Sequence, residues 1–548
     1  MVVVPTAKHM ADPLVAKWVL RRIRYAREID DQVRVDQLEA LFDEVTLRRI
    51  IQSHASDLVP DVFMNLSTRL FCPLEKYLLK SWPSWKGVVA CWSAQKIAEL
   101  APHDFRGVLA EFVKSPVVVS DLNRLFGVFN AVASMGKDAA DIATILVKRV
   151  QPEEDKQTWW YVLPDMVGSA VCTGIINEAI ALLIQAFGQA EDEQEKQRME
   201  SALSAAYKAL VGDLPYFNQI LDLSRDRAEQ GLADLPALFV EGSPLRMIDA
   251  AASKKGRIRL DAALELLPDG RDVAAIVGFS RRLSVAIQDL DNREDLEEML
   301  GNFLLAATAA HYAKDCLQPE GMGLSTLLSV SSYDVAKLPC YLEILNALRR
   351  LDLGEVITGM KGTLVKARGH YGGVHLVSMM GDLGYGEFID PLIECMSRDA
   401  GDFISEDAMK SLAKIGSEAV EVIMSRWRDL DYSQRIYGYG VMRHTGGGEP
   451  YLRFLQERFS EVRSRPADLE MWCTAVEATP DLHLVEILEK ELHRKLAAVD
   501  DTFATLCTLL DDERPGLKDA RRRIVERQAK KGNQTIPDDL NTTWPGRF

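Results

Sequence analysis

The sequence predicts an all-α fold, an α-solenoid of stacked antiparallel helix pairs. Two observations predict it. Apolar residues recur at helical spacing over most of the 548 residues. Short breaks also interrupt these patterns at a regular interval, at Gly354, Gly384, Gly416 and Gly446. A period of about 30–40 residues that consists of two helices is typical of α-solenoids.

Composition limits the classes of partner. The formal net charge is −16, with 47% hydrophobic and 27% charged residues, which is ordinary for a folded soluble protein. A chain this acidic repels nucleic acid and anionic membranes unless its basic groups gather on one surface. We therefore expect no nucleic-acid partner, and a nucleic-acid-binding solenoid remains an alternative.

The beginning of the chain and its cysteines bear on location. Pro5 interrupts a short apolar start and Lys8 follows soon after, so no signal peptide is expected. No apolar run is long enough to cross a membrane, and we expect a cytoplasmic protein without membrane insertion. The 8 cysteines form no CxxC pair, so we expect all of them to be reduced.

The first predicted helix covers residues 13–29 and carries a basic cluster. Apolar residues such as Trp18 recur on it at helical spacing. The basic residues are Arg21, Arg22, Arg24 and Arg27. One interpretation is a solvated face with Asp30 and Asp31 as counter-charges. The other is a docking site for an acidic partner.

The rest of the N-terminal half also reads as paired helices, with a longer and less regular repeat. The breaks fall at Ala101, Gly136, Gly174 and Gly212. Further helices are expected at 260–267, 272–290 and 295–314. The only β-branched cluster, near 115–120, is too short to predict a sheet.

Three regions are expected. Pro319, Gly321 and Gly323 mark a boundary before the regular repeats. Residues 1–330 form a divergent helical-repeat region, 331–513 the regular repeats, and 514–548 a basic C-terminal helix with an extended tail.

The regular repeats resemble a known family. Gly381 and Ala413 are small residues late in the first helix of a pair, a glycine turn follows each, and residues 419–424 are an apolar second helix. This pattern resembles HEAT repeats, in particular the short bacterial form also found in phycobilin lyases, over about 341–513. The resemblance implies a scaffold that binds partners along a concave surface made of second helices. Some members of the family are enzymes, so the fold does not decide the function.

Catalytic motifs are missing from the sequence. It contains no dinucleotide-binding, phosphate-binding or zinc-protease signature and no nucleophile elbow. HEAT-type metal hydroxylases use His-Glu pairs, and this chain has no His-Glu dipeptide. We therefore expect no catalytic residue, cofactor or metal, and predict a non-enzymatic protein–protein interaction scaffold or adaptor. The alternative is a HEAT-type lyase or isomerase acting on a bound chromophore or small molecule.

A tyrosine-, histidine- and arginine-rich stretch is the best candidate for the binding surface. It covers 369–459, and we expect it on the second-helix face of the repeats, because Tyr and Arg dominate binding hot spots. The candidate residues are Tyr371, Tyr437, Tyr439, His444, Arg453 and Arg458. The alternative is that the glycines of this stretch serve helix packing and that the tyrosines are core.

Two adjacent tryptophans are a further candidate. Trp159 and Trp160 are not expected to face inward together on one helix, so one of them is expected to be exposed. An exposed tryptophan would suit a partner hot spot. The alternative is a loop anchored by one of the two rings.

Overall fold

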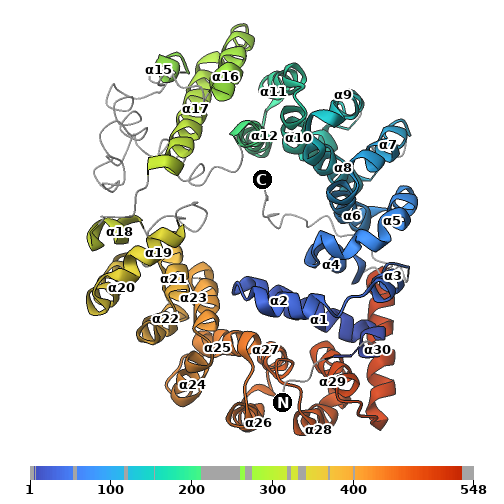
Figure 1. The fold of residues 1–548 in the computed structure, drawn as a ribbon, viewed down its shortest axis with the longest axis vertical. Coiled ribbons are helices and arrows are strands. Elements are labelled where there is room, and N and C mark those ends of the chain that lie inside the picture. The colour runs from blue at the N-terminus through green and yellow to red at the C-terminus, as the bar shows by residue number, and fades with distance from the viewer. Residues whose placement is uncertain are drawn as a thin grey trace. The chain divides into compact units, whose positions relative to one another are not determined.

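The structure is helical wherever it is described. This computed structural model describes residues 5–6, 8–52, 58–115, 121–152, 155–211, 260–265, 274–316, 323–330, 341–367, 371–398 and 402–532. Helices and turns make up these ranges, and none of them contains a strand (Figure 1). The predicted all-α class is therefore confirmed. The β-branched cluster, the break at Gly212 and the tail after residue 532 lie outside the described residues.

The chain divides into two compact units. Unit 1 consists of residues 1–70, 323–336 and 342–544, and unit 2 consists of 71–322, 337–341 and 545–548. The division near residue 323 falls in the predicted boundary region. The segment from Met1 to Leu70 nevertheless belongs with the C-terminal repeats, not with the N-terminal region in which the sequence analysis placed it.

Unit 1 contains two rows of helices. The first helices of the pairs are α21 Tyr371–Leu383, α23 Asp402–Ile415, α25 Tyr432–Thr445, α27 Pro466–Val476 and α29 Ala497–Leu509. The second helices are α22 Ile389–Cys395, α24 Ser417–Arg426, α26 Glu449–Val462, α28 Leu482–Glu491 and α30 Pro515–Gly532. Each first helix packs on the next first helix, so that α21, α23, α25, α27 and α29 form a continuous row (Figure 1). Helices α18 Leu324–Val330, α19 Tyr341–Arg350 and α20 Leu353–Ala367 precede the row.

Glycines make the turns inside these pairs. Gly384, Gly416 and Gly446 follow α21, α23 and α25 with φ angles of 72°, 94° and 67°. A side chain strongly disfavours such angles, so glycine at this position ends the first helix of these three pairs. The regular spacing of these residues in the sequence therefore reflects a repeated turn.

Aromatic packing fills the space between α24, α25 and α26. The Trp427 ring meets Tyr439 at 4.9 Å and Phe454 at 5.0 Å between centroids, both edge to face. Such pairs stabilise a core beyond the area they bury. All three residues are buried. The Tyr439 ring therefore belongs to the core of the repeat.

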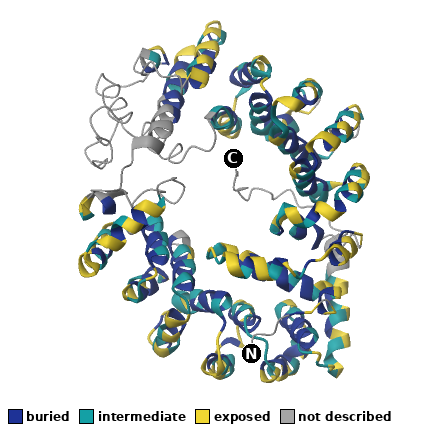
Figure 2. Ribbon diagram, in the orientation of Figure 1, coloured by how far each residue is buried: buried dark blue, intermediate teal, exposed yellow. Residues whose placement is uncertain are grey.

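Four N-terminal helices belong to unit 1, and the first of them lies on the row of first helices. They are α1 Pro13–Glu28, α2 Gln32–Glu39, α3 Glu44–Gln52 and α4 Leu58–Asn65. Helix α1 contacts α25 and α29, and many of its residues are buried (Figure 2). This contact explains why residues from the two ends of the chain share one unit.

Unit 2 has the same two-row arrangement. One row consists of α6 Gly87–Leu100, α8 Leu122–Met135, α10 Lys156–Cys172 and α12 Glu193–Val211. The other consists of α7 Pro102–Phe112, α9 Ala140–Arg149 and α11 Ile176–Gln189. Helix α5 Glu75–Ser81 precedes these rows, and α15 Leu260–Glu265, α16 Ala274–Ala286 and α17 Arg293–Cys316 follow them. Helix α10 packs against α8, α9, α11 and α12.

Two sequence expectations concern the whole chain. Six cysteines in the described part are free thiols, and four of them are buried. The side chain of Cys316 and all of Cys340 lie outside the described residues, so reduction of all 8 cysteines stays a prediction. Among the residues that the structure describes, no helix combines the length and apolarity that a membrane crossing requires.

Candidate functional site

Helix α1 is built to lie on an apolar surface. Asp12 begins it by accepting a hydrogen bond from the Leu14 backbone N–H at 2.9 Å, and Pro13 occupies the first turn. Val15, Trp18 and other apolar residues on its inner side are buried. The N-terminal helix therefore covers part of the row of first helices.

Glu477 receives the middle of this helix. It follows α27 directly and is buried. Its backbone carbonyl accepts a hydrogen bond from the Trp18 indole at 3.1 Å, and its carboxylate lies 3.0 Å from Nη2 of Arg21. Thr502 of α29 donates a further hydrogen bond of 2.9 Å to the same carboxylate. Helices α1, α27 and α29 thus meet at the buried carboxylate of Glu477, which has an ion-pair partner and a hydrogen-bond donor.

Two arginines bind the C-terminal end of α25. Arg22 donates to the backbone carbonyl of Arg443, and Arg34 of α2 donates to that of His444 at 2.7 Å. The last carbonyls of a helix lack partners within the helix and carry its negative dipole end, so cations stabilise them. Burial, and then the nearby charge of Arg34, lower the pKa of Arg22 to about 9.

His444 lies at the centre of this contact. Its Nδ1 is 3.1 Å from the Tyr25 carbonyl oxygen and therefore carries the proton that it donates. The rings of Tyr25 and His444 meet edge to face at 5.1 Å. Burial, followed by the charge of Arg443, lowers the pKa of His444 to about 3. The imidazole is neutral near pH 7, so Glu28, 3.5 Å from its Nε2, does not form an ion pair with it there.

Ion pairs fix both ends of the N-terminal segment. After α1, Asp30 lies 2.6 Å from the ammonium of Lys414, which also contacts Asp382 of α21 at 2.5 Å. Before α1, Lys8 lies 2.9 Å from Asp511, and Arg521 of α30 pairs with Asp12. The segment is thus held by ion pairs to α23, to the turn after α29 and to α30.

The arginines of the basic cluster of α1 differ in their exposure, and docking of an acidic partner there stays a prediction. Arg24 has a side chain that is 54% exposed and fits the solvated face. Arg22 is only 3% exposed, so the solvated interpretation is wrong for it. Its acceptors are backbone carbonyl oxygens of α25 within the same unit. Backbone carbonyls are present at every residue, so no acidic residue in the sequence marks these acceptors. The missed residues of the site are Trp18, Arg34, Glu477 and Lys414.

The predicted binding residues are divided between the two kinds of helix. Tyr437, Tyr439 and His444 lie on the first helix α25, whereas Arg453 and Arg458 lie on the second helix α26. Tyr371 begins α21, and its side chain is outside the described part. The six residues therefore do not form one second-helix face.

Their surroundings also differ. Tyr437 is half-buried, and His444 is buried under α1. Burial raises the pKa of Tyr439 above its ordinary value. Arg453 is exposed, with Glu449 at 3.7 Å, and Arg458 pairs with Glu461 at 2.5 Å. Binding of a partner by these residues stays a prediction.

The prediction that one tryptophan of α10 is exposed is wrong. Trp159 is 0% and Trp160 5% exposed, and their rings meet edge to face at 4.9 Å. Helices pack against α10 from several sides, so two adjacent positions can both face protein. Buried in this way, neither ring offers a surface to a partner.

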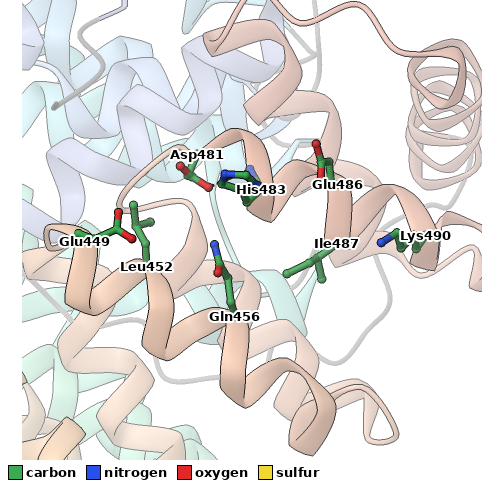
Figure 3. Close-up of a pocket in the computed structure, with 8 residues that line it drawn as sticks. All are labelled: Glu449, Leu452, Gln456, Asp481, His483, Glu486, Ile487 and Lys490. Atoms are coloured by element: carbon green, nitrogen blue, oxygen red, sulfur yellow. Dashed lines mark hydrogen bonds between the residues drawn. The ribbon is translucent and has the colours of Figure 1, made fainter.

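A groove lies between α26 and α28 on the second-helix side (Figure 3). It has a volume of about 470 Å³, and Leu452 and Ile487 form its apolar part. The polar residues that line it are Glu449, Gln456, Asp481, His483, Glu486 and Lys490. Asp481 already caps α28 by accepting from the backbone of His483 at 2.9 Å. This carboxylate is therefore engaged in capping its own helix.

Among the described residues, no group of three or more His, Cys, Asp and Glu side chains is placed to hold a metal ion. Comparison with models of known protein families, with curated proteins and with solved structures finds no match for this chain.

Proposed function

We propose that this protein is a non-enzymatic interaction scaffold, in which the paired helices of unit 1 form a HEAT-like α-solenoid. Its binding surface is the face of the first helices, and its ligand is a protein segment. The observation that supports this proposal is the way α1 binds to this face, where Trp18 and Arg21 both contact Glu477. A tryptophan and arginines on one side of a helix are the groups that dominate protein recognition.

Equivalent residues on successive first helices extend this surface. Asp382, Lys414 and His444 each lie two positions before the glycine turn of their own pair, and Lys414 contacts Asp382 directly. We name these three residues the docking level, because the N-terminal segment contacts Lys414 and His444. Such rows of equivalent positions are typical of repeat proteins that bind partners.

A second level lies two helical turns earlier. His375, Asp407 and Tyr437 have the same spacing and lie on α21, α23 and α25. All three are half-buried. We name them the distal level and place the partner there, beside the segment that already occupies the docking level.

Site-specific photo-crosslinking in the native host tests this function. A benzoylphenylalanine at Asp407 should capture one partner protein at stoichiometric yield. The same group at exposed Glu421 of the second helix α24 is the matched control and should not. Equal capture at both positions would refute the assignment of the face. A coloured purified chain with bound ligand mass and no partner would favour the lyase alternative.

A further inference from the structure

Unit 2 presents a row of half-buried side chains on α6, α8, α10 and α12. Trp92, Phe126, Tyr161 and Arg198 follow one another at nearly equal intervals, one on each helix. We name these four residues the aromatic row. None of them belongs to the contacts of unit 1 described above.

Close contacts show that neighbouring helices bring these positions together. The guanidinium of Arg198 lies over the Tyr161 ring, 4.5 Å from its centroid. At Gly127, beside Phe126, a Cβ atom would lie 2.5 Å from the Cα of Cys91, beside Trp92. Only glycine permits this approach of α8 to α6, because any side chain would meet backbone. These contacts bring α12 to α10 and α8 to α6 at the level of the aromatic row.

Side-chain amides flank the row in its middle. Asn123 and Asn130 lie about one turn before and after Phe126, and both are half-buried. Neither amide forms a hydrogen bond with another described residue. An asparagine offers donors and an acceptor together, which matches the alternating groups of a peptide backbone.

A carboxylate without a cation partner lies beside the row. Asp165 follows Tyr161 by one turn of α10. Within the described residues Asp165 forms no ion pair, although the nearby charge of Arg198 favours the ionised carboxylate. Burial raises the pKa of this carboxyl to about 7. Burying a carboxylate without a partner costs free energy, which an incoming cation would offset.

We propose that the aromatic row with Asp165 binds an extended peptide of a partner protein that carries an arginine or lysine. The cationic head pairs with Asp165, its aliphatic stem lies on Tyr161 and Phe126, and the asparagines bond the peptide backbone.

The spacing of the row fits an extended chain. Packed helices lie about 8–10 Å apart. An extended strand advances about 3.3 Å per residue, so roughly two to three residues cross from one helix to the next. A chain that runs along the row can therefore place successive side chains against successive helices. A single carboxylate selects one basic residue of that chain.

Peptide sub-libraries test the proposal on the full-length chain. Terminally blocked nonapeptides with a fixed central arginine, lysine, glutamine or glutamate are passed over the immobilised protein. The arginine and lysine pools should be retained at least about tenfold more tightly than the glutamine pool. Asp165→Asn should abolish this preference without lowering the melting temperature, because it removes a carboxylate that has no ion-pair partner among the described residues. Asp104→Asn, at an exposed position of α7, is the matched control and should retain the preference.

A second variant pair separates the backbone contacts from the charge. Replacing Asn123 and Asn130 by alanine should weaken retention of every pool and keep the preference for the basic ones. Equal retention of the arginine and glutamine pools would overturn the proposal, and so would a preference that survives Asp165→Asn. Failure to retain any pool would overturn it as well, without bearing on the partner of unit 1.

Discussion

Arg22 donates a hydrogen bond to the backbone carbonyl of Arg443, a residue 421 positions later in the chain. The bond joins the N-terminal helix to the end of α25, where the last carbonyls have no donor within the helix. It uses a buried guanidinium that binds carbonyl oxygens in place of a carboxylate. The N-terminal segment is therefore an integral part of the C-terminal unit, and its contacts should be measurable one by one.

Removing this guanidinium should destabilise unit 1. Arg22→Ala leaves the carbonyls of Arg443 and His444 with fewer donors in a buried place, at a cost of about 2–3 kcal/mol. Arg24→Ala removes an exposed side chain two positions away and should change stability little. Denaturant unfolding of both variants measures the difference. Similar stability of the two would show that the buried bond contributes nothing.

The carboxylate of Glu477 should matter through its charge. Glu477→Gln keeps the shape of the side chain and removes the partner of Arg21, which then remains in a largely buried place. We expect a loss of about 3 kcal/mol. Glu486→Gln, at a half-exposed carboxylate on α28, is the control. A thermal melt that shows the same change for both variants would contradict the role of Glu477.

Acid should weaken unit 1 through His444. Its pKa is lowered to about 3 in the folded protein from 6.5 in the unfolded chain. Between these values the unfolded state binds more protons, so stability falls as the pH falls below 6.5. From pH 6.5 to pH 5 the loss should approach about 2 kcal/mol. His444→Gln should flatten this part of the stability profile, and an unchanged slope would show that the imidazole is not buried as described.

The hydroxyl of Tyr439 should be dispensable, whereas its ring should not. The hydroxyl is buried and has no hydrogen-bond partner among the described residues. Tyr439→Phe should therefore leave stability unchanged or raise it. Tyr439→Ala removes the ring from Trp427 and should cost about 3–5 kcal/mol. If Tyr439→Phe also lost several kcal/mol, the hydroxyl would have a partner that this account lacks.

Local rules were enough to predict the helix pairs. A positive φ at the end of a helix strongly favours glycine, whatever surrounds it. The turns at Gly384, Gly416 and Gly446 could therefore be recognised from the sequence. The absence of alternating β-branched runs likewise excluded a sheet. Fold class and the positions of these turns therefore followed from short stretches of sequence.

Long-range contacts could not be predicted in this way. Whether Arg22 is solvated or buried depends on α25, which lies hundreds of residues away, and no short pattern encodes that neighbour. The prediction that one tryptophan of α10 is exposed was wrong for a related reason. A helix with one buried side cannot bury Trp159 and Trp160 together, but a helix packed from several sides can. The number of neighbours is a property of the fold.

Hydrogen exchange of the full-length chain tests the central claim most directly, namely that the first-helix face of unit 1 holds the N-terminal helix. Amides of residues 13–28 should be strongly protected in the wild-type protein. In Glu477→Gln, peptides covering 13–28 and 440–446 should lose protection together, while peptides of α8 and α10 in unit 2 should not change. Rapid exchange of residues 13–28 in the wild type, or loss of protection there with 440–446 unaffected, would contradict the account.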